Sequence, residues 1–414
     1  MIRRLIPILG ITFIDILGFS MLIPMLPYFV THFHASAIMV GVLFSTFSFC
    51  QLLAGPVWGN VSDRIGRKAV LIISQVGATI GWAMLAFAPD LTWVFIARIV
   101  EGISGGNIGI TQAYVADLVA PKDRSRAFGL IGAMFGAGMI FGPLGGGFLF
   151  AHYGFAVPFL VASGLQFITL VLTIVLLPES RTKEQEAQSQ VRLRDIGQTF
   201  SDPHLARILY QKLALSLGLY AWFSVMALYL KQQLHFGLAQ TDYFFSLVSV
   251  LGVGINIFVV SRVSERVGDR NMSSLGLVSL LAAFLLVAEV HGLVLLAIMA
   301  PLFSIGMAFA NTGITALISN AAADNRQGTV LGVSSSLDSF AGIVSPLAST
   351  GLLTKYGSPY AGVTSAVLSA IALAMGLAAT RSEERSAIAV GAGMPGCDPV
   401  QSATASAAAA EAEL

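Results

Sequence analysis

The sequence predicts an all-α membrane protein with twelve transmembrane helices in two pseudo-symmetric six-helix bundles. Three observations predict this fold: an apolar composition, a succession of membrane-length apolar stretches, and an internal repeat. Hydrophobic residues make up 56% of the 414 residues and charged residues only 11%, whereas a soluble domain has roughly 25% charged residues. The mean hydropathy of +0.80 excludes an ordinary soluble protein. The net charge of +1 gives no reason to expect a nucleic-acid partner.

The apolar stretches have the length that a membrane requires. A helix needs about 20 apolar residues to cross a bilayer, and twelve such stretches follow one another along the chain. The first begins after two arginines but has no small-residue cleavage site, so we expect a membrane helix there and not a signal peptide. The stretches cover residues 5–31, 38–60, 69–88, 92–118, 128–150, 156–178, 208–231, 241–261, 272–290, 293–318, 328–352 and 359–380.

The distribution of lysine and arginine predicts the orientation. Most of these residues fall in the loops of one side, which is the cytoplasmic side by the positive-inside rule, and an even number of spans then places both termini in the cytoplasm. The tail is rich in Ala, Gly and Ser, which is typical of disorder. The predicted domains are an N-terminal bundle (1–180), a cytoplasmic linker (181–207), a C-terminal bundle (208–380) and a disordered cytoplasmic tail (381–414).

An internal repeat relates the two halves. The loop GNVSDRIGRK at 59–68 recurs as SRVSERVGDR at 261–270, and the pentapeptide NIGIT recurs as NTGIT. Pro143 in the fifth stretch corresponds to Pro346 in the eleventh. Parallel repeats of this kind are typical of transporters that hold a substrate between two halves, near the middle of the bilayer.

The first of these loops resembles the G-x-x-x-D-R-x-G-R-K signature of the major facilitator superfamily. The resemblance covers almost the whole chain and is closest to the twelve-helix drug:proton antiporters, which include the tetracycline efflux pumps. It implies a conformational latch, in which Asp63 lies at the positive N-terminus of the eleventh helix and Arg67 pairs with Asp117. Because Ser261 and Asp269 break the pattern in the second copy, we expect a stronger latch in the first half. A simple positive loop with a glycine turn is the alternative. The latch residues are Gly59, Asp63, Arg64, Gly66, Arg67, Lys68 and Asp117.

The fifth stretch, GLIGAMFGAGMIFGPLGGG, resembles the antiporter motif of the same family. Glycines at these spacings allow close helix packing, and the proline bends the helix. The resemblance implies export; generic helix packing is the alternative. The motif residues are Gly129, Gly138, Gly142, Pro143, Gly146 and Gly147.

Four charged residues inside apolar stretches are candidates for proton coupling. An acid at the bilayer centre costs about 2.5–3.5 kcal/mol, which marks it as functional by default, and burial favours the neutral form of a carboxyl group. Asp15 and Asp338 fall near the middle of their stretches. Arg98 and Glu101 are spaced i, i+3 and can touch, in a segment that resembles an R-x-x-x-G motif linked to proton transfer. The alternatives are structural hydrogen-bonding roles for the two aspartates and a self-neutralising pair near the outer end of the fourth helix.

Polar and aromatic residues inside the stretches are candidates for a substrate cavity. A cavity with few fixed charges and many apolar groups suits a lipophilic or weakly cationic compound. The apolar run LVSLLAAF stands where the tetracycline pumps carry a midmembrane acid, which separates this chain from them. The candidates are Gln51, Asn107, Gln112, Tyr114, Tyr220, Trp222, Asn256 and Asn311.

Together these features predict a proton-driven exporter of small lipophilic or cationic compounds in a bacterial inner membrane. We expect a monomer in the lipid bilayer whose coupling ion is a proton, with no cofactor, metal, catalytic residue or nucleic-acid partner. A membrane-embedded enzyme is not favoured, because no zinc-protease or nucleotide-loop motif is present. The remaining alternatives are a proton-coupled uptake symporter for a metabolite and a lipid-moving or sensor protein on the same fold.

Overall fold

The part of the chain that the structure describes is mostly helical, with short non-helical connections. This computed structural model describes residues 2–392 except 106–109, 112–113, 116–117, 120–123, 180–199, 201, 288–291, 323–326 and 358–359. These residues form twelve α-helices and a five-residue π-helix, η3. The helices are α1 (Ile2–His32), α2 (Ile38–Ile65), α3 (Arg67–Ala86), α4 (Leu91–Ser104), α6 (Arg124–Tyr153), α7 (Ala156–Leu176), α9 (Pro203–Gln233), α10 (Leu238–Ile255), η3 (Asn256–Val260), α11 (Ser261–Leu286), α12 (Leu293–Ala321), α13 (Gln327–Tyr356) and α14 (Val363–Ala392).

Many of these helices have the dimensions of membrane spans. Eight helical segments in the described residues are long and apolar enough to cross a membrane. One of them, Leu238–Leu286, joins α10, η3 and α11 in a single run. Large apolar side chains are exposed on the outside of the bundle, as at Phe258 and Val294, which suits contact with lipid tails. The prediction of twelve crossings extends to segments outside the described residues, such as the end of the fourth stretch.

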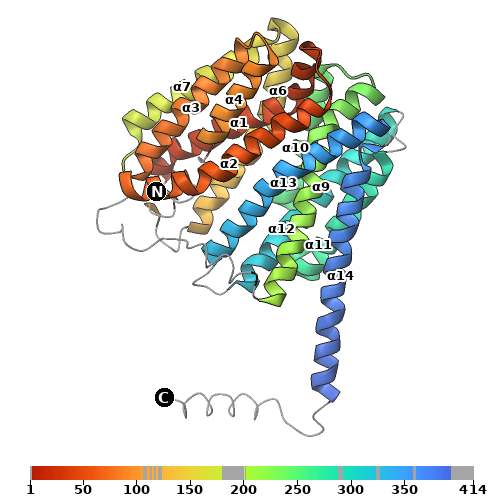
Figure 1. The fold of residues 1–414 in the computed structure, drawn as a ribbon. Helices are drawn as coiled ribbons and strands as arrows, with labels where there is room; N and C mark the ends of the chain where they lie inside the picture. The colour runs from red at the N-terminus through yellow and green to blue at the C-terminus, as the bar shows by residue number, and fades with distance from the viewer. Residues whose placement is uncertain are drawn as a thin grey trace.

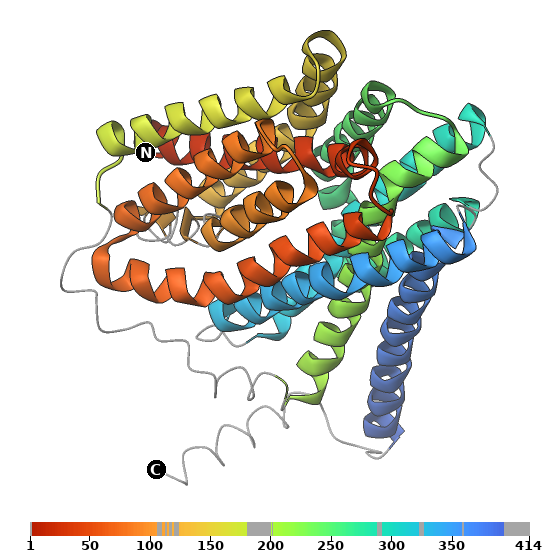
Figure 2. The same ribbon diagram turned by 45° about the horizontal axis from the view of Figure 1, so that its top comes forward.

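The helices pack in two sets that meet along two seams. Helices α1, α2, α3, α4, α6 and α7 pack on one another, and α9 to α14 pack on one another. The sets join where α2 lies along α13 and where α6 lies along α10. Figure 1 shows α2 and α13 side by side, and Figure 2 shows the two sets from a second direction. This arrangement brings residues from both halves of the sequence to a common interior.

The repeat in the sequence is also a repeat in the backbone. Gly66 between α2 and α3 has φ 97°, and Gly268 at the corresponding place has φ 79°. Gly154 after α6 and Gly357 after α13 form a second pair, with φ 84° and 90°. Only glycine adopts such angles without strain. The two sets therefore turn at equivalent positions.

Both copies of the loop are helical apart from their shared glycine, where the sequence predicted a polar loop. Helix α11 begins at Ser261, and Gly268 is a kink within it. In both copies a serine binds the residue after the glycine: Arg67 donates to Ser62 Oγ at 2.5 Å, and Ser264 donates to Asp269 Oδ1 at 2.5 Å. The local hydrogen bond persists although the charge of its partner is inverted.

Two helices of the C-terminal half extend beyond the stretches that the sequence predicted. Helix α9 begins at Pro203, not at 208, because Asp202 caps it by accepting from the backbone N–H groups of His204 and Leu205. Helix α14 continues to Ala392 and projects beyond the other helices in Figure 1. Residues 381–392 were predicted to be disordered, but their alanines favour a helix. Residues 393–414 lie outside the described residues.

Several contacts between the two sets lie on the side away from the start of α1, called here the far side. The Tyr28 hydroxyl near the end of α1 donates to the Phe236 carbonyl oxygen at 3.0 Å. Lys231 near the end of α9 donates to Thr31 Oγ1 at 3.0 Å. Both contacts cross from one set to the other. The two sets are therefore held together on the far side.

Candidate functional site

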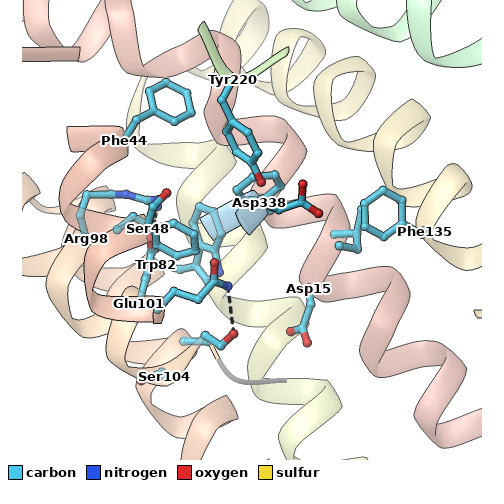
Figure 3. A pocket seen from close by; sticks show the side chains of 16 residues that line it. Asp15, Phe44, Ser48, Trp82, Arg98, Glu101, Ser104, Phe135, Tyr220 and Asp338 are labelled. Carbon is cyan, nitrogen blue, oxygen red and sulfur yellow. Dashed lines mark hydrogen bonds and ion pairs between the residues drawn. The ribbon is translucent and has the colours of Figure 1, made fainter. Parts of the chain in front are cut away.

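An interior cavity of about 350 Å³ gathers the charged residues that the sequence singled out. Side chains of both helix sets line it, from α1, α2, α3, α4, α6, α9 and α13. Figure 3 shows Arg98 and Glu101 on one wall and Asp15 and Asp338 on the other. We call this space the charged cavity. The predicted residues that line it are Asp15, Gln51, Arg98, Glu101, Tyr220 and Asp338.

Arg98 and Glu101 form an ion pair within α4. Their side chains are only 2% and 5% exposed. The Arg98 guanidinium also lies 4.2 Å from the centre of the Phe47 ring, a favourable cation–π distance. Gly81 on α3 lets the pair pack closely, because a Cβ there would lie only 2.5 Å from Glu101 Cγ. The pair contributes to the wall of the cavity, in addition to neutralising itself.

Asp15 on α1 is held by a neutral partner. The Gln166 side chain on α7 donates from Nε2 to Asp15 Oδ1 at 2.9 Å, and Gln166 is only 1% exposed. An amide can hydrogen-bond to a carboxyl group in either protonation state. The contact with Gln166 therefore suits Asp15 in either state.

Asp338 on α13 pairs with a lysine that the sequence analysis did not select. Lys212 Nζ on α9 lies 3.2 Å from Asp338 Oδ1, and the Lys212 side chain is 7% exposed against 34% for Asp338. Ser216 donates to the same carboxylate oxygen at 2.5 Å. Lys212 also donates to Asn311 Oδ1 on α12 at 2.9 Å. The sequence carried little signal, because Lys212 lies near the start of the predicted stretch 208–231, where a long lysine side chain can reach the membrane surface.

A second cavity of about 430 Å³ lies between α6, α9, α10 with η3, and α12. Its walls are mainly apolar and rich in methionine, and Phe135 lines both cavities. We call it the methionine cavity. Its polar groups include the predicted residues Asn256 and Asn311, together with Thr312, which donates to Asn256 Oδ1 at 3.3 Å. Its large apolar residues include Met139, Phe223, Met226, Phe245 and Met307.

Two of the predicted cavity residues are packed elsewhere. Tyr114 is 0% exposed, and its hydroxyl donates to the Pro178 carbonyl oxygen at 2.8 Å. Trp222 is also 0% exposed and packs against the rings of Tyr229 and Phe284. Neither lines the charged cavity or the methionine cavity, because the side chains face neighbouring helices, which helix position alone does not reveal. Asn107 and Gln112 lie outside the described residues.

Glu179, which follows α7, binds the loop with the superfamily signature. The sequence analysis did not select this residue. Its carboxylate accepts from the backbone N–H groups of Arg67 at 2.9 Å and Lys68 at 3.2 Å. These are the first residues of α3, where the helix dipole favours an anion. Gly66 permits this approach, since a Cβ there would meet the Glu179 carboxylate. The Glu179 contact fixes the turn between α2 and α3.

The predicted latch contacts themselves stay predictions. The Asp63 side chain and Asp117 lie outside the described residues. Arg64 is exposed, and a Cβ at Gly59 would have no other group within 4 Å. Lys68 donates from Nζ to the Ile174 carbonyl oxygen at 2.8 Å, which ties α3 to α7.

The glycines of the antiporter motif have three different environments. Three of them face α1, and at Gly142 a Cβ would meet Ser20 Oγ and the Leu17 carbonyl. Gly147 faces the other helix set, where its Cβ would lie 2.7 Å from Asp242 Cβ. Gly129 has open space and lines the methionine cavity. Pro143 lies inside α6. The three that face α1 are Gly138, Gly142 and Gly146.

Asp242 is a further buried acid that the sequence analysis missed. It lies near the start of α10, is 0% exposed, and packs against Gly147 of the motif. Within the described residues neither carboxylate oxygen has a hydrogen-bond partner. A lone acid in the apolar segment TDYFFSLVSV was the signal.

The chain is similar to known membrane transporters. The family model described as the Major Facilitator Superfamily matches residues 8–260 and 213–399. The class C tetracycline resistance protein of Escherichia coli is 29% identical over 372 residues, covering 87% of this chain and 92% of the relative. Multidrug resistance protein 2 of Bacillus subtilis (strain 168) is 26% identical over 341 residues, covering 81% of this chain and 84% of the relative.

Solved structures share the fold. The human organic anion transporter MFSD10 superposes with a TM-score of 0.70 at 22% identity, over 90% of this chain and 99% of that chain. A bacterial homolog of the human lysosomal transporter Spinster, in an inward-facing and unoccupied conformation, gives a TM-score of 0.76 at 13% identity, over 92% of this chain and 96% of that chain. At these identities the likeness concerns the fold alone.

Proposed function

We propose that this chain, which belongs to the Major Facilitator Superfamily, is a proton-coupled antiporter. It exports small lipophilic or weakly cationic compounds from a bacterial cell. The observation that carries the proposal is the charged cavity, to which both helix sets bring carboxyl groups. Its tetracycline and multidrug resistance relatives support export. The chain acts in this proposal as a monomeric transporter of the inner membrane, not as an enzyme, and needs no cofactor besides the proton.

The three acids of the charged cavity give the proton alternative binding places. Glu101 has an arginine, Asp338 a lysine and Asp15 an amide as partner. If a substrate and a proton cannot occupy the cavity region together, the downhill flow of one drives the other uphill. One pH unit supplies about 1.4 kcal/mol and 100 mV about 2.3 kcal/mol per charge. Their sum sustains a substrate gradient of a few hundred-fold.

The far-side contacts suit one stage of an alternating-access cycle. With both termini in the cytoplasm, as the lysine and arginine distribution predicts, the far side is the outer side. The Tyr28 and Lys231 contacts then close the outer side in this arrangement. The latch of the superfamily loop belongs to the opposite stage, in which the cytoplasmic side closes. In this proposal twelve helices cross the membrane, and the linker lies in the cytoplasm.

The proposal is tested by transport in proteoliposomes. The probe is the dye Hoechst 33342, and a gradient of about one pH unit is imposed in either direction. An exporter moves the dye against the proton flow, whereas an uptake symporter moves it with the proton flow. Dye movement that follows the protons, or that ignores the gradient, contradicts the proposal.

A substitution at Asp15 tests the coupling carboxylates within the same assay. Asp15→Asn keeps a hydrogen-bonding side chain beside Gln166 but cannot release a proton, so we expect gradient-driven movement to fall toward the gradient-free rate. Asp202→Asn is the matched control, because Asp202 caps α9 outside the cavity and asparagine is also a good cap. If Asp15→Asn leaves the flux and its pH dependence unchanged, Asp15 does not carry the coupled proton.

A further inference from the structure

Lys212 connects the two cavities. Its ammonium group lies 3.2 Å from Asp338 Oδ1 and donates to Asn311 Oδ1 at 2.9 Å. Asp338 lines the charged cavity, and Asn311 lines the methionine cavity. One cation therefore forms an ion pair with a group that can bind a proton and a hydrogen bond with a group that can bind a ligand.

The lining of the methionine cavity defines the ligand that fits it. Three methionines and three phenylalanines line it, and methionine adapts to irregular apolar shapes. Among the described lining residues none is charged; the polar side chains are neutral and belong to Ser249, Asn256, Ser304, Asn311 and Thr312. The space therefore suits a lipophilic body that carries a hydrogen-bond donor, and the Asn311 carbonyl oxygen is an acceptor for that donor.

We propose that Lys212 couples the cavities by competition: a ligand donor that takes the Asn311 oxygen moves Lys212 onto Asp338, and a proton on Asp338 returns Lys212 to Asn311. This inference rests on the proposed antiport and names the residues that perform its exchange. Ligand in the methionine cavity and proton on Asp338 then exclude each other. Mutual exclusion of this kind is what antiport requires.

The burial of Lys212 gives the competition its strength. A buried ammonium group needs partners, because leaving it unpaired is costly. When the ligand occupies Asn311, the carboxylate of Asp338 becomes the main compensating partner, so the ionised carboxylate is favoured. When Asp338 is protonated, its attraction for Lys212 falls and the lysine depends on Asn311, whose oxygen is then less available to a ligand.

Other titratable groups face Asp338 and also contribute to the pH dependence of binding. Tyr220 on α9 lines the same wall region, and Asp15 lies on α1 of the opposite set. Arg98 and Glu101 on α4 also line the cavity but are paired with each other. These groups are unchanged in the variants that follow, so their titration is common to all of them.

The test is the pH dependence of ligand binding to the purified full chain in detergent. Hoechst 33342, which carries N–H donors, is titrated by fluorescence at pH 6 and pH 8. For wild type we expect the Kd to rise as the pH falls, by at most about tenfold for each pH unit if one proton is exchanged. In Asn311→Leu the Kd should lose this pH dependence. Asn256→Leu is the matched control: Asn256 lines the same cavity but bonds Gly252 and Thr312, so its variant should keep the wild-type pH dependence.

A second variant and a second probe make the test independent of one substitution. Lys212→Gln retains a donor without the charge, and we expect it to lose the pH dependence as Asn311→Leu does. Tetraphenylphosphonium is lipophilic but has no hydrogen-bond donor. Its binding should therefore show the same pH dependence in wild type and in Asn311→Leu.

Two results distinguish the failure of this inference from the failure of the proposed function. If wild-type proteoliposomes transport the dye against a proton gradient while Asn311→Leu and Lys212→Gln keep the wild-type pH dependence of binding, the role of Lys212 is wrong and antiport stands. If wild type shows no gradient-driven transport, the proposed function itself is wrong.

Discussion

The two helix sets bring different kinds of ion pair to one cavity. In the first set, Arg98 and Glu101 lie one turn apart on α4, and both side chains are at most 5% exposed. In the second set, Lys212 on α9 reaches Asp338 on α13, and Asp338 is 34% exposed. The first pair depends on one helix alone, whereas the second depends on how two helices pack. The two halves therefore differ in their ion pairs. We call Arg98–Glu101 the sealed pair, because it is buried on one helix, and Lys212–Asp338 the adjustable pair, because it joins two helices.

Breaking the sealed pair should have the largest effect on stability. Arg98→Met leaves Glu101 buried without its cation, and breaking a buried pair in this way costs about 3–5 kcal/mol. The loss of stability is measured by thermal unfolding in detergent, with size-exclusion chromatography to quantify the folded protein that remains.

The matched change in the other set is Lys212→Met. We expect a smaller loss of stability, because Asp338 is partly exposed and keeps the hydrogen bond from Ser216. Equal losses in Arg98→Met and Lys212→Met would remove the distinction between the two pairs.

A glycine of α6 should have an intermediate effect. Gly142 corresponds to the buried Ser345 of α13, which shows that a serine fits one set. In α6 a side chain at this position meets Ser20 and the Leu17 carbonyl, so Gly142→Ser should cost about 1–3 kcal/mol by overpacking. Gly129→Ser is the control, because its surroundings are open. The reading of α6 as tightly packed on α1 fails if the two variants unfold at the same temperature.

The repeated turn glycines should show the smallest difference. Both have positive φ and ψ near 155°, with Gly66 at φ 97°, ψ 153° and Gly268 at φ 79°, ψ 157°, so alanine is strained at either place. Only Gly66 also packs against a carboxylate, that of Glu179. We expect Gly66→Ala to be less stable than Gly268→Ala by about 1 kcal/mol, the typical worth of a charge at a helix N-terminus. The same thermal assay checks the order, and a reversed order would contradict the role of Glu179.

Much of the fold could be predicted because membrane-length apolar stretches determine where helices lie. The main exception is the repeated loop, which is helical on both sides of its shared glycine in each half, because a polar sequence that contains glycine is compatible with a kinked helix as well as a loop. For the site, Asp15 and Asp338 were conspicuous as acids in apolar stretches, and Arg98 with Glu101 through their helical spacing.

The missed residues depend on partners that are distant in the sequence. Lys212 was identified by its contacts with Asp338 and Asn311 on two other helices, and Asp242 by its packing on Gly147. Trp222 shows the opposite error, since its aromatic side chain was assigned to a cavity and is buried in the core. Which face of a membrane helix meets a cavity, a neighbour or lipid is decided by tertiary packing, which composition does not encode.

The most direct test of proton coupling in the charged cavity reverses the usual assay. Proteoliposomes are loaded with Hoechst 33342, no pH gradient is imposed, and the internal pH is followed as the dye leaves. The account predicts that dye efflux from wild-type vesicles drives protons inward and acidifies the interior. Vesicles with Asp338→Asn should release dye with little change of pH. Acidification of the same size in both preparations, or none in wild type, would contradict the account.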